Sequence, residues 1–238
     1  MPLIVTERHS ARDMDHWRRL ERADAVDAQR LAARLDVAEI KAARVIRDFA
    51  AAGDCYMSIS WGKDSIAVAY ILAQLEREEG LALPCTWIRV RHFENPDCAR
   101  ARDAFLSQWP LSRYEEITVD AGENRAGGTS ALGFKEAARR WGDRHISGVR
   151  GAESRVRRIA MYRWGTASAR TARPIGWWPT AWIFAHAYLR QLPVHPVYGY
   201  TGGGTWAREH LRTASLGGDR GGEQRSQWEG HYYSDIVG

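Results

Sequence analysis

The chain has 238 residues, 45% of them hydrophobic, and its 34 lysines and arginines exceed its 29 acidic residues by five. This is enough for one large domain or two small ones with a buried core. No stretch reaches the roughly 20 apolar residues of a membrane span, and the first residues lack the basic-then-apolar pattern of a signal peptide. We therefore expect a soluble, cytoplasmic protein without a membrane partner.

The three cysteines, Cys55, Cys85 and Cys98, lie far apart in the sequence. Their spacing excludes a disulfide framework and fits no zinc or iron–sulfur motif, so we expect no iron–sulfur cluster. Arginine supplies nearly all of the positive charge. Scattered surface arginines explain the net charge of +5 at least as well as an anionic partner does.

The first half of the chain predicts helices around a buried strand. Apolar spacing indicates an amphipathic helix or arm within residues 1–30 and a firmer helix over 27–52. A short apolar run at 55–59 predicts a strand, residues 60–65 a loop, and residues 66–79 a helix that Gly80 ends. A strand, a loop and a helix in this order form the first half of a βαβ unit.

The same alternation continues. We predict strands at 86–90, 116–119 and 145–148, helices at 97–109, 134–141 and 153–162, and a glycine-rich link at 122–128. This pattern predicts an α/β fold, a Rossmann-like parallel sheet with helices on both faces. Ligands of such sheets bind beyond the carboxyl ends of the strands.

The alternation stops near Arg163. Residues 164–176 predict a loop and residues 179–191 a tryptophan-rich helix, and the last 40 residues hold ten glycines and few aliphatic side chains. We predict three parts: a helical arm over 1–52 packed on the core, a central nucleotide-binding domain over 53–198, and a Gly/Arg-rich tail or lid over 199–238.

The strongest chemical signal is the segment from Ser58 to Ser65, which reads Ser-Ile-Ser-Trp-Gly-Lys-Asp-Ser between the first predicted strand and its helix. A loop there turns backbone N–H groups toward one point, and the helix N-terminus adds partial positive charge. The spacing is not that of a Walker A loop. A helix cap is the alternative, but it explains neither the glycine nor the lysine. We predict phosphate contacts from Ser58, Ser60, Gly62, Lys63, Asp64 and Ser65.

This loop resembles the PP-loop of the adenine nucleotide alpha-hydrolase superfamily, which includes PAPS reductases and ATP pyrophosphatases. The PP-loop reads Ser-Gly-Gly-x-Asp-Ser, and Trp61 stands where the family has its first glycine. The residues that match are Ser60, Gly62, Lys63, Asp64 and Ser65.

A second segment, from Ser147 to Arg157, resembles the G-x-R-x-x-E-S-x-x-R element of the PAPS reductase branch, whose arginines meet the anionic end of the nucleotide. Arginine is well shaped to bind phosphate or sulfate oxygens in pairs. A solvated basic helix face is the alternative. The resemblance implies nucleotide contacts from Gly148, Arg150, Glu153, Ser154 and Arg157.

Residues 173–178 and 192–198 resemble further elements of that branch, although packing of the tryptophans explains them as well. Reductases of the branch attack sulfate with a cysteine in a C-terminal E-C-G-x-H motif. Here no cysteine follows Cys98, so we do not expect reduction by this thiol route. Cys98 itself is more readily explained as a small structural residue.

Two further groups are weaker candidates. The resemblance implies that Glu94, after the second predicted strand, holds the ribose while His92 or Phe93 stacks on adenine; a simple turn at this point is the alternative. In the C-terminal part, a group around a glycine-rich stretch either closes on an anion or is disordered without function: Arg208, Arg212, Thr213 and Ser215.

The resemblance implies an enzyme that binds an adenine nucleotide, ATP or PAPS, and acts at its phosphates. With ATP, a substrate oxygen would attack the α-phosphorus and release pyrophosphate. Lys63, Asp64 and Arg150 are the expected catalytic residues, with Mg²⁺ on Asp64 sharing the charge.

Two alternatives stay open: a PAPS reductase proper, and a nucleic-acid-modifying or nucleic-acid-binding module whose arginines and tryptophans contact phosphates and bases. The acceptor is a small molecule or a nucleic acid. The sequence decides neither this point nor whether the chain forms a homo-oligomer.

Overall fold

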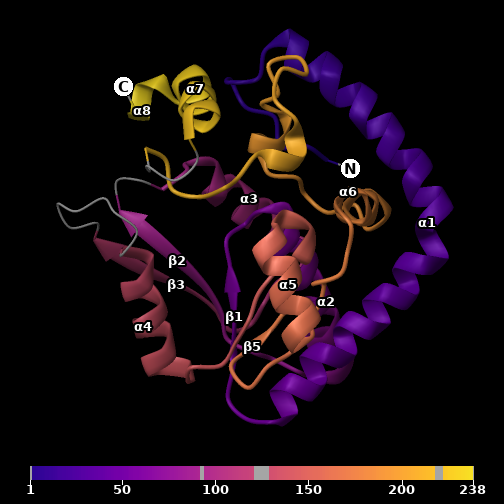
Figure 1. The fold of residues 1–238 in the computed structure, drawn as a ribbon, viewed down its shortest axis with the longest axis vertical. Helices are drawn as coiled ribbons and strands as arrows, with labels where there is room; N and C mark the ends of the chain where they lie inside the picture. The colour runs from indigo at the N-terminus through magenta and orange to yellow at the C-terminus, as the bar shows by residue number, and fades with distance from the viewer. Residues whose placement is uncertain (1, 92–93, 121–128, 218–221, 238) are drawn as a thin grey trace.

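A five-stranded parallel sheet lies at the centre of the computed structural model, which describes residues 2–91, 94–120, 129–217 and 222–237. The strand order is β3-β2-β1-β4-β5, and every neighbouring pair is parallel. The prediction of a Rossmann-like α/β fold is thus confirmed (Figure 1). The strands are β1 (Tyr56–Ile59), β2 (Cys85–Arg91), β3 (Tyr114–Asp120), β4 (His145–Ile146) and β5 (Thr171–Ala172).

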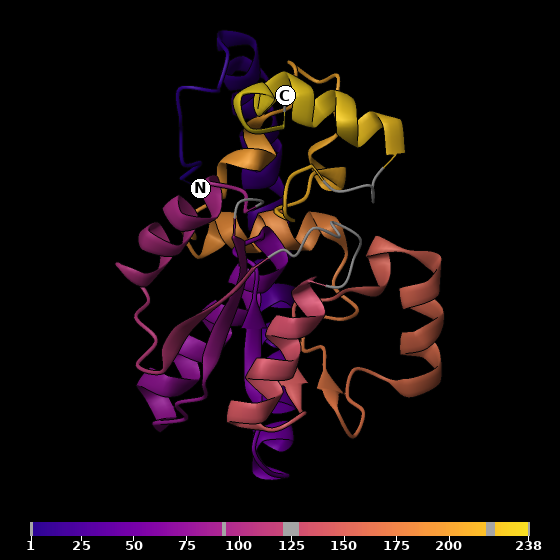
Figure 2. The same ribbon diagram turned by 90° about the vertical axis from the view of Figure 1, so that its left-hand side faces the viewer.

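Helices cover both faces of this sheet (Figures 1 and 2). On one face lie α2 (Lys63–Glu79) and α3 (Asp97–Leu106), and on the other lie α4 (Thr129–Trp141) and α5 (Arg155–Trp164). The helix α2 is buried on nearly every side because α1 (Ala11–Ala51) and α6 (Thr180–Leu189) pack over it. This third layer explains why α2 is apolar all round rather than amphipathic.

The helix α1 is continuous over 41 residues and unites the two helical segments predicted at the N-terminus. It begins at a capping box, in which the Ser10 hydroxyl accepts from the Asp13 N–H and the Asp13 carboxylate accepts from the Ser10 N–H, both at 3.1 Å. Its buried side follows Leu31, Leu35 and Ile46 and packs mainly on α6. None of the described helices combines the length and the apolar character that a bilayer crossing requires.

The described residues after Tyr198 are packed on the rest of the molecule, in contrast to the flexible alternative predicted for them. They include α7 (Gly222–Tyr232), α8 (Ser234–Val237) and a short 3-10 helix, Arg208–His210; two further 3-10 helices are Gly151–Glu153 and Pro196–Gly199. Side chains from all three predicted parts meet in one buried cluster. The division of the chain into three parts stays a prediction.

The C-terminal part contributes aromatic rather than aliphatic side chains to the buried cluster, among them Tyr200, Trp228 and Tyr233.

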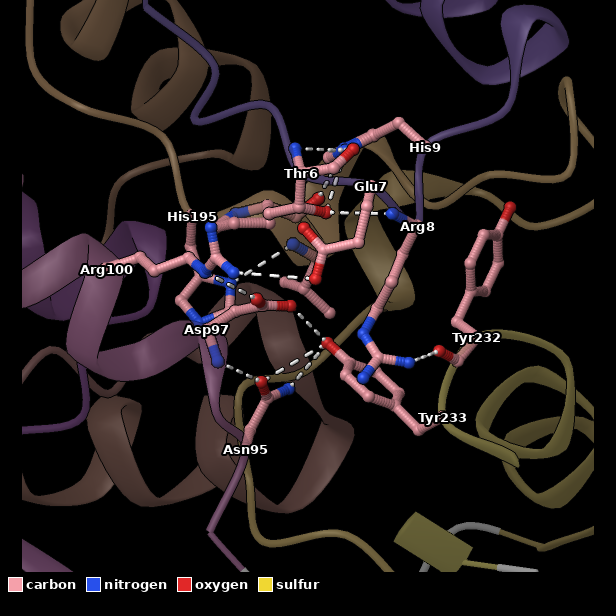
Figure 3. Close-up of polar contacts among 12 residues, drawn as sticks. Thr6, Glu7, Arg8, His9, Asn95, Asp97, Arg100, His195, Tyr232 and Tyr233 are labelled. Carbon is pink, nitrogen blue, oxygen red and sulfur yellow. Dashed lines mark hydrogen bonds and ion pairs between the residues drawn. The ribbon is translucent and has the colours of Figure 1, made fainter. Parts of the chain in front are cut away.

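Polar contacts tie both ends of the described chain to the start of α3 (Figure 3). The Asp97 carboxylate accepts from the hydroxyls of Tyr200 at 2.9 Å and Tyr233 at 2.8 Å. Arg8 forms an ion pair with Asp235 at 2.6 Å. The N-terminal segment, the start of α3 and the two last helices therefore hold one another in place.

Candidate functional site

A cavity of about 290 Å³ lies beyond the carboxyl ends of β1 and β4. These two strands are neighbours at the point where the sheet order changes direction, which is where open α/β sheets bind ligands. Most of the predicted site residues meet there. Those that line the cavity are Ser58, Ser60, Gly62, Lys63, Asp64, Ser65, Gly148, Glu153 and Arg157.

The loop between β1 and α2 is held by its own hydroxyl groups. The Ser65 hydroxyl donates to the Gly62 carbonyl at 3.0 Å and lies 3.3 Å from both the backbone nitrogen and the hydroxyl of Ser60. The N-cap of α2 is Gly62, which has no side chain to cap the helix. The Lys63 N–H donates to the Tyr198 hydroxyl instead, and the N–H groups that follow it in the first turn are the ones that an anion could use.

Trp61 shapes this loop from behind. Its φ of 58° lies in the left-handed region, where glycine is the usual residue. The indole points away from the cavity and is fully buried against the rings of Trp87, Phe105 and Tyr114. Packing of this large ring therefore holds a backbone conformation that the related PP-loop pattern assigns to glycine.

Two glycines allow close approach of neighbouring segments. A Cβ atom on Gly148 would lie 2.7 Å from the Asp64 carbonyl carbon and 2.8 Å from the Ser65 nitrogen. A Cβ on Gly62 would lie 2.9 Å from the Thr213 hydroxyl oxygen. The turn after β4 thus packs directly on the first turn of α2, and the C-terminal part packs on its cap.

Two buried cations share one carboxylate beside the cavity. The Lys63 Nζ lies 2.9 Å from Asp64 Oδ2, and the Arg150 Nε lies 2.6 Å from Asp64 Oδ1. The Lys63 side chain is only 2% exposed, and burial lowers its pKa even though Asp64 acts in the opposite direction. With Lys63 protonated, the three groups carry a net charge of +1; Arg212 and the ion pair of Arg157 with Glu153 line the same cavity. An anion bound there would offset this buried positive charge.

Three predicted contact residues do not reach the cavity. Arg150 lies beneath it, where its guanidinium binds Asp64 and donates to the Trp178 carbonyl at 2.9 Å. Ser154 caps α5 by accepting from the Arg157 N–H at 3.2 Å. Glu94 is paired with Arg89 at 2.6 Å. Arg150, Ser154 and Glu94 do not line the cavity, and their predicted roles stay predictions.

Other expectations fall outside the described part of the chain. His92 and Phe93, predicted to stack on adenine, belong to the residues that the structure does not describe, as does the glycine-rich link at 122–128.

Several residues without a predicted role complete the cavity. The Tyr198 hydroxyl accepts from the Lys63 N–H at 3.1 Å, and its ring lies 5.1 Å from Lys63 Nζ. Phe134 and His145 form an aromatic wall with ring centres 5.9 Å apart, and burial together with Arg173 lowers the pKa of His145. Ser147 and Val149, on either side of Gly148, also line the cavity.

The C-terminal part contributes Arg212 and Thr213 to the cavity. Thr213 donates its hydroxyl to the Ser60 carbonyl at 3.2 Å, which fastens this segment to the loop. The lid alternative for residues 199–238 is consistent with this contact. Of the other two residues in that predicted group, Arg208 pairs with Asp24 in the interior, and neither Arg208 nor Ser215 lines the cavity.

The cysteine and carboxylate chemistry of the site is limited. Cys98 is buried, its thiol donates to the carbonyls of Ser60 and Thr213, and burial raises its pKa strongly, so it has the character of a structural thiol. Both oxygens of Asp64 are taken by cations, and its role as a Mg²⁺ ligand stays a prediction. Among the described residues, no group of three or more His, Cys, Asp or Glu side chains is placed to hold a metal ion.

No family model and no curated protein matches the chain. Among solved structures, it resembles the U34-tRNA thiolase NcsA from Methanococcus maripaludis, described with its [4Fe-4S] cluster, at 15% sequence identity and a TM-score of 0.45 over 77% of this chain and 68% of that chain. NcsA belongs to the PP-loop superfamily. The comparison contradicts one expectation: we expected no iron–sulfur cluster from the cysteine spacing, whereas this similar protein holds one, and the expectation is withdrawn.

Proposed function

We propose that the chain is a PP-loop enzyme that binds the phosphate end of an adenine nucleotide in the cavity between β1 and β4. One observation carries the proposal: Lys63, Asp64 and Arg150 place a net positive charge, almost fully buried, beside the N-terminus of α2, whose N-cap residue Gly62 has no side chain. A buried charge of this kind is costly unless an anion balances it. A helix N-terminus and a lysine are a common combination for phosphate binding.

The geometry supports nucleotidyl transfer. In this reaction an oxygen of the acceptor forms a bond to the α-phosphorus while the bond from that phosphorus to the bridging oxygen breaks, and pyrophosphate leaves with the electron pair. Lys63 and the hydroxyls of Ser60 and Ser65 are placed to hold the leaving group, since all three line the cavity. Asp64 orients Lys63, and Arg150 orients Asp64.

Reduction of PAPS has less support. It needs a thiolate that reaches the sulfur, and Cys98 is buried, with its pKa raised by burial. Phe134 and His145, whose rings are tilted by 47° to each other, each offer an aromatic surface to the adenine of either nucleotide. ATP is therefore the favoured ligand, and PAPS is the alternative that the experiment must separate.

Calorimetric titration with ATP and with PAPS tests the proposal, together with an assay for pyrophosphate release. Lys63→Met removes the buried cation, and we expect it to weaken nucleotide binding by roughly ten- to a hundred-fold, the usual effect of losing a hydrogen bond to a charged group. Lys41→Met is the matched control, because Lys41 is exposed on α1 and should leave affinity unchanged. The proposal would be refuted if neither ATP nor PAPS bound to the protein. It would also be refuted if Lys63→Met and Lys41→Met bound the nucleotide with equal affinity.

A further inference from the structure

The helix α5 stands at the edge of the molecule with little covering it (Figure 2). Only Met161 of its ten residues is buried. Large apolar side chains are left in solvent, and the ring of Tyr162 lies 4.9 Å from that of Trp177 in the following loop. We call four residues the α5 patch: Val156 (77% exposed), Ile159 (55%) and Tyr162 (77%), which follow one another at three-residue spacing on α5, and Trp177 (47%) beside Tyr162. Apolar groups gathered on a surface in this way mark an interaction site more often than a free surface.

The patch lies in a strongly basic stretch. Residues 154–208 contain no aspartate or glutamate and eight arginines. Four of these arginines are on α5. One of the four, Arg157, forms an ion pair with Glu153, which lies just before the helix. In the part of the chain that the structure describes, no carboxylate lies within ion-pair distance of the other three, Arg155, Arg158 and Arg163.

The arginines of α1 differ in this respect. Several of them are paired within the same helix, as Arg18 is with Asp15, Arg30 with Asp27 and Arg44 with Asp48. A solvated helix face usually mixes both signs of charge in this way. The α5 face instead combines exposed aromatic rings with positive charge that no neighbouring acid balances.

We infer that the α5 patch binds a single-stranded segment of nucleic acid. Tyr162 and Trp177 offer neighbouring rings on which unpaired bases stack, and the arginines attract the phosphates between them. A second copy of the same face would bring like charges together. Arg157, another residue of α5, lines the cavity, so α5 lies between the patch and the anion site. This inference goes beyond the nucleotide site and does not depend on it.

Fluorescence anisotropy with labelled single strands of about 20 nucleotides, DNA and RNA, tests the inference, with a duplex as comparison. We expect binding that weakens steeply between about 50 and 200 mM salt. The double variant Tyr162→Ala/Trp177→Ala should weaken binding at least about ten-fold through lost stacking. The triple variant Arg155→Gln/Arg158→Gln/Arg163→Gln should reduce the slope of log affinity against log salt by about two.

A charge-matched control separates the patch from net charge. Arg18→Gln/Arg30→Gln/Arg44→Gln removes the same number of charges from α1 and should change the affinity for the strand less than about two-fold. The α5 variants should still bind ATP, because the substituted residues do not line the cavity, and Lys63→Met should still bind the strand. If the unmodified protein bound the single strand but not ATP, the nucleotide site would be refuted and the inference about the α5 patch would stand.

Three results would overturn the inference. One is no binding of any single strand at low salt, and another is an equal loss of affinity in the α1 and α5 triple variants. The third is that the α5 variants change only binding to anionic phospholipid vesicles, or only self-association, which would assign the patch to a membrane or to a second copy.

Discussion

Asp64 is the residue on which the charge balance of the cavity rests. One of its oxygens holds Lys63 at the cavity wall, and the other holds Arg150 in the interior below. The two cations are therefore not equivalent. Lys63 lines the cavity, whereas Arg150 contacts Asp64 and the Trp178 carbonyl and does not line it. A substitution of Arg150 should thus disturb the fold as well as the site, because it leaves these buried acceptors with fewer donors.

Gly148 offers a test at the same scale. In Gly148→Ala the added methyl would lie within 3 Å of backbone atoms of Asp64 and Ser65, which cannot move without shifting the first turn of α2. We expect a loss of about 1–3 kcal/mol in the free energy of unfolding, together with weaker nucleotide binding. Urea unfolding and calorimetric titration measure the two effects.

Gly230→Ala is the control for this variant. Gly230 lies in α7 and has no neighbour within 4 Å of the added methyl, so the change should be neutral or slightly stabilising. Equal stability and equal nucleotide affinity in the two alanine variants would show that the close approach at Gly148 contributes neither to stability nor to nucleotide binding.

At the scale of elements, α1 is joined to the C-terminal part by a buried ion pair. Arg208 binds both carboxylate oxygens of Asp24, one of them at 2.7 Å, and its guanidinium lies 3.7 Å from the centre of the Phe184 ring. Removal of one partner leaves an uncompensated buried charge. The pair therefore holds residues around Arg208 against α1 and α6, close to the segment that supplies Arg212 to the cavity.

A double-mutant cycle measures this pair. Asp24→Leu and Arg208→Met should each lower the free energy of unfolding by about 3–5 kcal/mol, since each leaves one charge buried and alone. The double variant should recover most of that loss, because it buries no charge. Urea unfolding of the four proteins gives the coupling, and additive losses in the double variant would contradict the expectation.

The elements that could be predicted are those with a local signature. The strand, loop and helix from Tyr56 to Glu79 carry contiguous apolar runs and a contiguous polar motif, so both the βα unit and most of the anion loop could be read from the sequence. The two-residue strand β5 is too short to show a period. The C-terminal part resisted prediction because aromatic rings and contacts such as that between Asp97 and Tyr233, 136 residues apart, stabilise it.

The same distinction holds within the site. Lys63 and its neighbours were recognisable because they follow one another in the loop, whereas Tyr198 and Phe134 reach the cavity from distant elements. Sequence spacing placed Arg150 at the correct edge of the sheet. Its burial depends on Trp178 and Thr180, which meet it only in the folded chain.

At the scale of the whole molecule, His195 makes the fold sensitive to acid. It is fully buried, and its Nδ1 accepts from the Val197 N–H at 3.1 Å. Burial lowers its pKa to about 3. As pH falls from about 6.5, the unfolded chain binds a proton at this residue that the folded chain does not, so the free energy of unfolding decreases until the folded pKa is reached.

The variant His195→Asn tests this contribution, because an asparagine oxygen can accept from the same N–H without titrating. Between about pH 6 and 4 the unmodified protein should lose up to about 1.4 kcal/mol per pH unit through His195, and the variant should lose correspondingly less. Urea unfolding at several pH values provides the comparison. Parallel pH dependence in the two proteins would contradict the assignment; His9 and His145, whose pKa values are also lowered, are present in both.

The left-handed backbone at Trp61 has a consequence for the entropy of binding. A glycine there would leave the free loop many conformations, and a ligand would have to select one of them. The enclosed indole packs against the rings of Trp87, Phe105 and Tyr114, and this packing limits the conformations of the loop before a ligand binds. The conformational entropy of the loop is therefore lost during folding, so that ordering the loop subtracts little from the free energy of anion binding.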